Sequence, residues 1–270
     1  MNILDARDEK KLQKTYDNFV EYSGVTKLDK DLYFNFLRPD IIFEECLNEK
    51  YIHVENDGDY ALRWYADGKD LYIYFQWSHS TMDWFSNLDF PAKTYKDTET
   101  SWKVHRGFLR VWKTIREYIK DAILDEKIKN ICICGYSHGA AIAFLAHEYV
   151  WFNRPDLRES HLASYVFGCP RVFYGRPHNN IEERWKNFYM FRNCNDIVTH
   201  APPRIFGFRH LGNMVWIGDN KKLKKHQKLN CVNAHYDDNY MKSLKDFYQN
   251  LANCDKMPNW YYEGGYNDRD

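Results

Sequence analysis

One stretch of the chain decides the fold: residues 134–144 read CGYSHGAAIAF. Before it lies the apolar run Ile131-Cys132-Ile133-Cys134, and after it an apolar, alanine-rich segment continues to Ala146. A short apolar run, then glycines, then an alanine-rich segment is typical of a buried strand, a tight turn and a helix. The order strand, turn, helix is the building unit of an α/β sheet.

The turn itself carries the pattern G-x-S-x-G, with Gly135 and Gly139 on either side of Ser137. In a sharp strand-to-helix turn, side chains two residues from the serine would collide with neighbouring backbone, so glycine is required there. The helix N-terminus then aims free N–H groups at an oxyanion formed beside the serine. The pattern alone is a weak signal, but its place between strand and helix is the context that this chemistry needs. We therefore interpret Ser137 as a nucleophile rather than a plain turn residue.

The rest of the chain alternates strand and helix patterns. Strand patterns occur at 51–57, 59–68, 71–77, 129–134, 163–170, 187–193 and 212–218. Helical periodicity predicts helices over about 107–123 and 139–151, and a C-terminal helix marked by Tyr240, Leu244, Phe247 and Leu251. Three strands are thus predicted before the first long helix. We expect parallel βαβ units in a doubly wound sheet, and a single domain over 1–270 in which residues 1–50 form a helical N-terminal extension.

Composition narrows the classes of partner and compartment. The 38 basic and 38 acidic residues cancel, which argues against nucleic acid as a partner, although local patches are compatible with this balance. The N-terminus carries charged residues within its first ten positions and lacks the apolar region of a signal peptide. Seven cysteines include no CxxC pair, and CxC on a strand is a poor zinc pair. We expect a cytoplasmic protein without a metal site.

A serine nucleophile requires a base and an acid that orients the base, which are expected later in the chain. Asp196 follows the strand predicted at 187–193, at the carboxyl end where ligand chemistry gathers in open α/β sheets. Asp219 is the second candidate, whereas Asp237 and Asp238 lie too close to the candidate base. Asp196 is the predicted acid; its alternative role is that of a turn or cap residue.

Four of the 11 histidines follow Asp196 in the chain. His200 is too near the acid, and His226 lies in the basic loop KKLKKHQK. His235 precedes the last predicted helix, in a loop from which a base can project over the sheet. His235 is therefore the predicted base, and His210 is predicted to be structural.

With these residues in place, the chain resembles the class 3 lipase family of α/β hydrolases. The similarity runs from about Leu71 to Tyr240 and rests on several motifs in order, among them VHRGFLRVW, CGYSHGAAIA, YVFGCPRVF, NDIVTHAPP and FRHLGNMVWIG. The resemblance implies the α/β-hydrolase fold, with a central, mostly parallel sheet and helices on both faces. It also implies the triad reached from chain order, and it requires no cofactor.

An oxyanion hole formed by Ser78 and the backbone N–H of His138 is a further implication of the resemblance. Gln76-Trp77 stands where the family usually has Arg-Gly, so the register between Ser78 and Ser80 stays open. His138 replaces the usual Leu, and its side chain could tune the site, cap the helix or face solvent.

The family's lid corresponds to Ser80 through Phe90. Helical spacing there places an apolar stripe that could cover the site, formed by Met82, Trp84, Phe85 and Leu88. The same stripe is equally typical of a short core helix that never moves.

Taken together, the sequence predicts a serine carboxyl-ester hydrolase of the lipase or esterase kind, acting through an acyl-enzyme on a small-molecule or lipid ester. Transient contact with a lipid interface is compatible with this prediction. Acyl transfer or phospholipase activity would use the same triad, and a non-catalytic α/β-hydrolase scaffold used for binding is the alternative of another class. Nothing in the sequence specifies the acyl chain, the head group or the oligomeric state.

Overall fold

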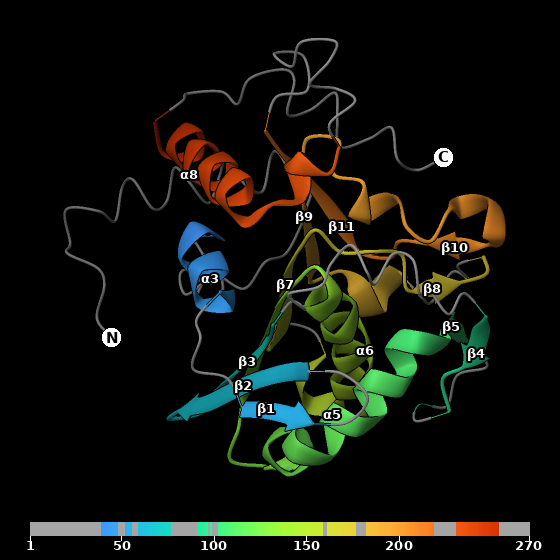
Figure 1. Cartoon of the computed structure of the whole chain (residues 1–270). Coiled ribbons are helices and arrows are strands. Elements are labelled where there is room, and N and C mark those ends of the chain that lie inside the picture. The colour runs from blue at the N-terminus through green and yellow to red at the C-terminus, as the bar shows by residue number, and fades with distance from the viewer. Residues whose placement is uncertain are drawn as a thin grey trace.

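The structure is a computed structural model that describes residues 39–47, 52–55, 59–76, 91–96, 98, 102–158, 161–176, 182–218 and 231–253. Seven strands of this part form one sheet in the order β1-β2-β3-β6-β7-β9-β11 (Figure 1). They are β1 (Ile52–Glu55), β2 (Asp59–Asp67), β3 (Asp70–Phe75), β6 (Asn130–Tyr136), β7 (Leu162–Phe167), β9 (Phe188–Asn193) and β11 (Asn213–Ile217). The first three strands pair antiparallel, and all pairs from β3 to β11 are parallel. The predicted mostly parallel sheet is confirmed.

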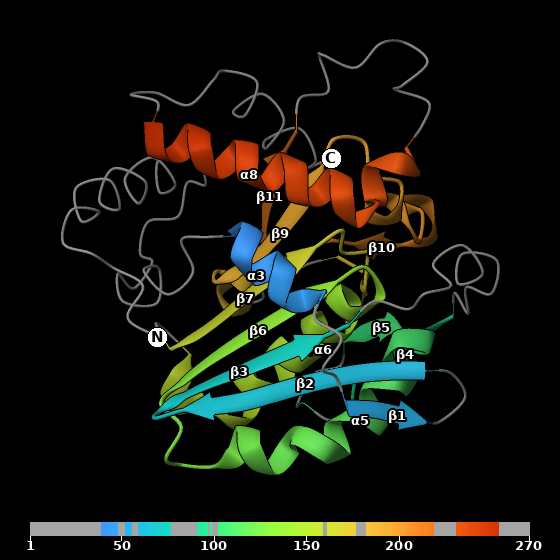
Figure 2. The ribbon, with the colours of Figure 1, turned by 60° about the vertical axis from the view of Figure 1, so that its left-hand side comes forward.

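Helices cover both faces of this sheet (Figure 2). One core forms against α5 (Arg106–Leu124) and α6 (His138–Asn153), and the other against α3 (Pro39–Cys46) and α8 (Asp237–Asn253). Strand β6 serves both cores: Ile131 and Ile133 pack on the α5 and α6 side, and Cys132 and Cys134 on the opposite side. Because both of its faces are covered, the strand reads as a continuous apolar run. The cysteines act there as small apolar side chains.

A second sheet was not expected. It has the antiparallel order β10-β8-β5-β4 and consists of β4 (Ala92–Thr94), β5 (Lys103–His105), β8 (Phe173–Tyr174) and β10 (Phe208–Arg209). The prediction that three strands precede the first long helix is wrong, because β4 and β5 also precede α5. Strands of two or three residues are too short to show the alternation by which strands are recognised.

The predicted helices occur with small shifts at their ends. The α5 helix begins at Arg106, where the His105 side chain accepts a hydrogen bond from the Phe108 N–H (3.4 Å). Tyr240, Leu244 and Phe247 of α8 are buried, as the periodicity predicted. Of the predicted N-terminal extension, α3 is described and contacts α8 and the sheet. The rest of the predicted extension, residues 1–38 and 48–50, lies outside the described residues, and the single domain stays a prediction.

Short 3₁₀ turns complete the described part: η2 (Pro155–Leu157), η3 (Glu182–Trp185), η4 (Val198–His200), η5 (Arg204–Phe206) and η6 (Asn233–His235). Among the helices described, none has both the length and the apolar character to cross a membrane.

Candidate active site

The turn between β6 and α6 has the geometry that the glycines predicted. Ser137 has φ 56° and ψ −119°, a conformation strained for a residue with a side chain. A Cβ on Gly135 would lie 2.4 Å from the Gly139 carbonyl oxygen, and one on Gly139 would lie 2.2 Å from that of Phe75. Backbone cannot yield at such distances, so only glycine fits either position. The strand therefore ends with the Ser137 side chain lifted out of the sheet.

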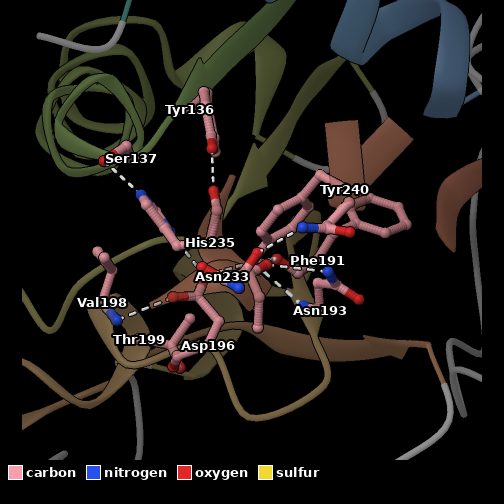
Figure 3. Close-up of polar contacts among 12 residues, drawn as sticks. Tyr136, Ser137, Phe191, Asn193, Asp196, Val198, Thr199, Asn233, His235 and Tyr240 are labelled. Carbon is pink, nitrogen blue, oxygen red and sulfur yellow. Dashed lines mark hydrogen bonds and ion pairs between the residues drawn. The ribbon is translucent and has the colours of Figure 1, made fainter. Parts of the chain in front are cut away.

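Ser137, His235 and Asp196 form one hydrogen-bonded chain (Figure 3). The Ser137 hydroxyl and His235 Nε2 are 2.8 Å apart, and His235 Nδ1 and Asp196 Oδ2 are also 2.8 Å apart. The three residues come from the β6–α6 turn, from η6 before α8, and from the loop after β9. With the proton on Nδ1 shared with the carboxylate, Nε2 is free to accept the hydroxyl proton. All three side chains are buried.

Asp196 is held by donors on both of its carboxylate oxygens. Oδ1 accepts the Val198 N–H (2.9 Å), and Oδ2 accepts the Tyr240 hydroxyl (2.6 Å) in addition to His235. Burial, and then the nearby Asp196 charge, raise the pKa of Tyr240 well above its ordinary value, so this phenol stays a donor. The sequence placed Tyr240 on the core face of α8 and gave no sign of this contact.

His235 is positioned from two further sides. The Tyr136 hydroxyl donates to the His235 carbonyl oxygen, and the two rings stack with centroids 5.2 Å apart. Gly168, with φ 58°, lies against the imidazole: a Cβ there would be 2.7 Å from Cε1 of His235 and 3.0 Å from Oδ2 of Asp196. Sequence reasoning missed both residues as parts of the site, although the motif YVFGCPRVF contains Gly168.

The side chain of His138 is buried against Phe108, with ring centroids 5.4 Å apart. Of the three roles left open by the sequence, exposure to solvent is therefore wrong. Burial, and then the neighbouring His105, lower the pKa of His138 to about 4, which keeps the ring neutral at pH 7. Its backbone N–H belongs to the first turn of α6, where amides have no acceptor within the helix. An amide in the first turn of a helix can donate to an anion bound at that end.

Several other candidates lie away from the serine or outside the described residues. His210 Nε2 is 2.8 Å from the Thr199 carbonyl oxygen, and His200 contacts Arg192. Ser78, Ser80, Asp219, His226 and the lid segment with Met82, Trp84, Phe85 and Leu88 lie outside the described residues. Within the described ranges, no group of three or more His, Cys, Asp or Glu side chains is arranged to hold a metal ion.

Comparison with known proteins decides the family. Residues 72–206, half of the 270-residue chain, match the family described as Lipase (class 3). The chain belongs to the class 3 lipase family. The predicted resemblance to this family is thereby confirmed. The matched segment contains the β6–α6 turn and Asp196.

Individual relatives are also named as lipases. A lipase from Rhizomucor miehei is 31% identical over 56% of this chain and 43% of the relative. A secreted mono- and diacylglycerol lipase from Fusarium solani is 29% identical over 55% of this chain and 44% of the relative. The chain thus spans less than half the length of these curated relatives.

Solved structures agree on the fold. A Rhizomucor miehei lipase in complex with its propeptide superposes with a TM-score of 0.54 at 21% identity, over 90% of this chain and 80% of that one. A triacylglycerol lipase, described as having a serine protease triad as its catalytic centre, gives 0.55 at 22% identity, over 86% and 94%. The predicted α/β-hydrolase fold is confirmed.

Proposed function

We propose that the protein is a serine carboxyl-ester hydrolase that cleaves lipid esters through an acyl-enzyme. One observation carries the proposal: a continuous hydrogen-bonded chain from the Ser137 hydroxyl through His235 to Asp196, with 2.8 Å at each step. Membership in the class 3 lipase family supports the same chemistry.

In the proposed mechanism, Ser137 Oγ attacks the ester carbonyl carbon while His235 Nε2 takes the hydroxyl proton. Asp196 holds the imidazole in the tautomer with its proton on Nδ1 and stabilises the imidazolium that forms. The oxyanion receives the backbone N–H of His138 and the hydroxyl of Ser78. His235 then gives its proton to the leaving alcohol. Water, deprotonated by the same His235, attacks the acyl-enzyme and releases the acid.

Acylglycerols are the substrate class that we propose. The curated relatives are named as lipases and as mono- and diacylglycerol lipases. A cytoplasmic location stays a prediction, because several of these relatives are named as secreted. Cys132, Cys134, Cys169 and Cys231 are free thiols, which suits a reducing compartment.

The decisive experiment compares the purified protein with Ser137→Ala and His235→Gln on p-nitrophenyl esters of short and long acyl chains. We expect losses of at least about 10⁴-fold in kcat, and fluorophosphonate labelling at Ser137. His210→Gln is the matched histidine control and should retain activity. Labelling at another residue, or turnover retained by Ser137→Ala, would refute the proposal.

The oxyanion register has its own test. Removing one oxyanion donor typically lowers kcat by about 10²–10³-fold. Ser78→Ala should show this loss and Ser80→Ala should not. The reverse result would move the donor to Ser80.

A further inference from the structure

The four short strands of the second sheet and their flanking segments carry an unusual charge distribution. No aspartate or glutamate occurs in residues 91–96, 102–116, 161–176 or 197–218, although Asp97 and Glu99 lie in the connection between β4 and β5. The exposed basic side chains of these segments are Lys93, Lys96, Lys103, Arg106, Arg110, Lys113, Arg176 and Arg204. The zero net charge of the chain therefore hides a local excess of positive charge.

Strand pairing brings these segments together. In the order β10-β8-β5-β4, the sheet joins segments that lie more than a hundred positions apart, along one side of the molecule (Figure 1). Arg209 Nη1 donates to the Arg204 carbonyl oxygen (2.7 Å). The Gly175 N–H donates to the Gly207 carbonyl oxygen (3.0 Å), so the residue after Gly175, Arg176, lies near Arg204 and Arg209. Burial, and then the charges of Arg204 and Arg176, lower the pKa of Arg209. None of the described carboxylates forms an ion pair with these three arginines.

An apolar tip projects from the same place. Ile205 is 87% exposed and Phe206 is 53% exposed, in the η5 turn between Arg204 and Arg209. Gly207, at φ 92°, closes the turn, and a Cβ there would lie 2.8 Å from the Tyr174 ring, so the turn is braced on β8. An aliphatic side chain exposed to this extent gains free energy only when another apolar medium covers it.

The loops that hold the acid and the base carry further exposed apolar side chains. Ile197 and Tyr236, both exposed, directly follow Asp196 and His235 in the chain, and the Ile197 N–H donates to the Cys231 carbonyl oxygen (3.3 Å). Phe208, two residues after the exposed Phe206, is buried and packs on His105, with ring centroids 5.6 Å apart. Exposed apolar side chains therefore occur both at the η5 tip and directly after the acid and the base in the chain.

We infer that the η5 tip and the basic second sheet dock the protein on an anionic lipid surface, with Ile205 and Phe206 inserted among the lipids and the arginines at the phosphate level. This inference rests on the proposed function, because docking would bring Ser137 to its lipid ester substrates. Aromatic and aliphatic side chains flanked by cations are the composition of an interfacial anchor. A second copy does not fit, because it would oppose cation to cation. Nucleic acid supplies the phosphates but no apolar medium for Ile205.

Binding is measured with Ser137→Ala protein, so that hydrolysis does not alter the vesicles. The assay is co-sedimentation with phosphatidylcholine vesicles, with or without about a third of phosphatidylserine. We expect at least tenfold tighter binding to the anionic vesicles, weakened by salt. Adding Arg176→Gln/Arg204→Gln should lower the affinity at least tenfold, and adding Ile205→Ser/Phe206→Ser should do the same. Leu124→Ser, at an exposed apolar position of α5, is the control and should leave vesicle affinity unchanged.

Equal binding to neutral and anionic vesicles, or unchanged binding by both double variants, would overturn the inference. Loss with the arginine variant alone, together with displacement by a DNA oligonucleotide, would also overturn it in favour of a polyanion site. The proposed function is tested separately on a soluble short-chain ester, where both double variants in the wild-type background should retain the wild-type rate. Vesicle binding without esterase activity would refute the proposed function but not the docking surface.

Discussion

Gly168 offers a sharp test of how closely the site is packed. A Cβ at this position would lie 2.7 Å from Cε1 and 2.9 Å from Nδ1 of His235, and 3.0 Å from Oδ2 of Asp196. The imidazole cannot simply swing away, because Ser137 and Asp196 hold its two nitrogens. Gly168→Ala should therefore displace the base from its two partners.

The expected magnitudes follow from these distances. Ordinary contact begins at 3.4 Å, so the ring has to recede by about 0.7 Å. A displacement of about 1 Å from the reacting geometry lowers rates by roughly 10²-fold, so we expect kcat to fall about 30- to 100-fold with little change in KM. The positive φ of 58° adds about 1–2 kcal/mol of lost stability for alanine, a few degrees in Tm.

Gly68→Ala separates the two effects. Gly68 has φ 62° in the turn between β2 and β3, and a Cβ there meets nothing within 4 Å. Both variants should lose similar stability in thermal unfolding, while only Gly168→Ala loses kcat on a soluble p-nitrophenyl ester. A Gly168→Ala enzyme whose kcat stays within threefold of that of Gly68→Ala would refute the reasoning.

Tyr240→Phe keeps the buried ring and removes the donor to Asp196; kcat should fall roughly tenfold with KM unchanged, and a change in KM alone would contradict this. Burial lowers the pKa of His138 from 6.5 to about 4, so its neutral form adds stability above pH 6.5 that is lost as the pH falls toward 4. In urea unfolding, His138→Leu should remove about 3 kcal/mol of this pH dependence of the free energy of unfolding. A free energy of unfolding that falls with pH as steeply in the variant as in wild type would contradict this. All seven cysteines should titrate as thiols in denaturant without reductant, whereas missing thiols would indicate disulfides and an oxidising compartment.

The order of elements could be read from the sequence because its causes are local. Gly135 and Gly139 lie two positions from Ser137, so the pattern itself contains the steric reason for the turn. The burial of α5 and α8 follows from the helical period of their apolar residues. Chain order and family resemblance selected Asp196 and His235, and the structure places both beside Ser137. The second sheet escaped prediction because its strands are too short to carry a period.

What the sequence by itself determined is therefore the strand–turn–helix unit and the residue types that serine chemistry needs. The tertiary structure alone decided which distant groups support them: Tyr136 meets the His235 carbonyl across 99 positions, and Tyr240 meets Asp196 across 44. It likewise decided the charge distribution, since a neutral composition becomes a basic sheet only when β10, β8, β5 and β4 pair. The physical reason is the same in each case. Contacts between residues far apart in the chain depend on how the sheets and helices pack, and local patterns carry no record of that packing.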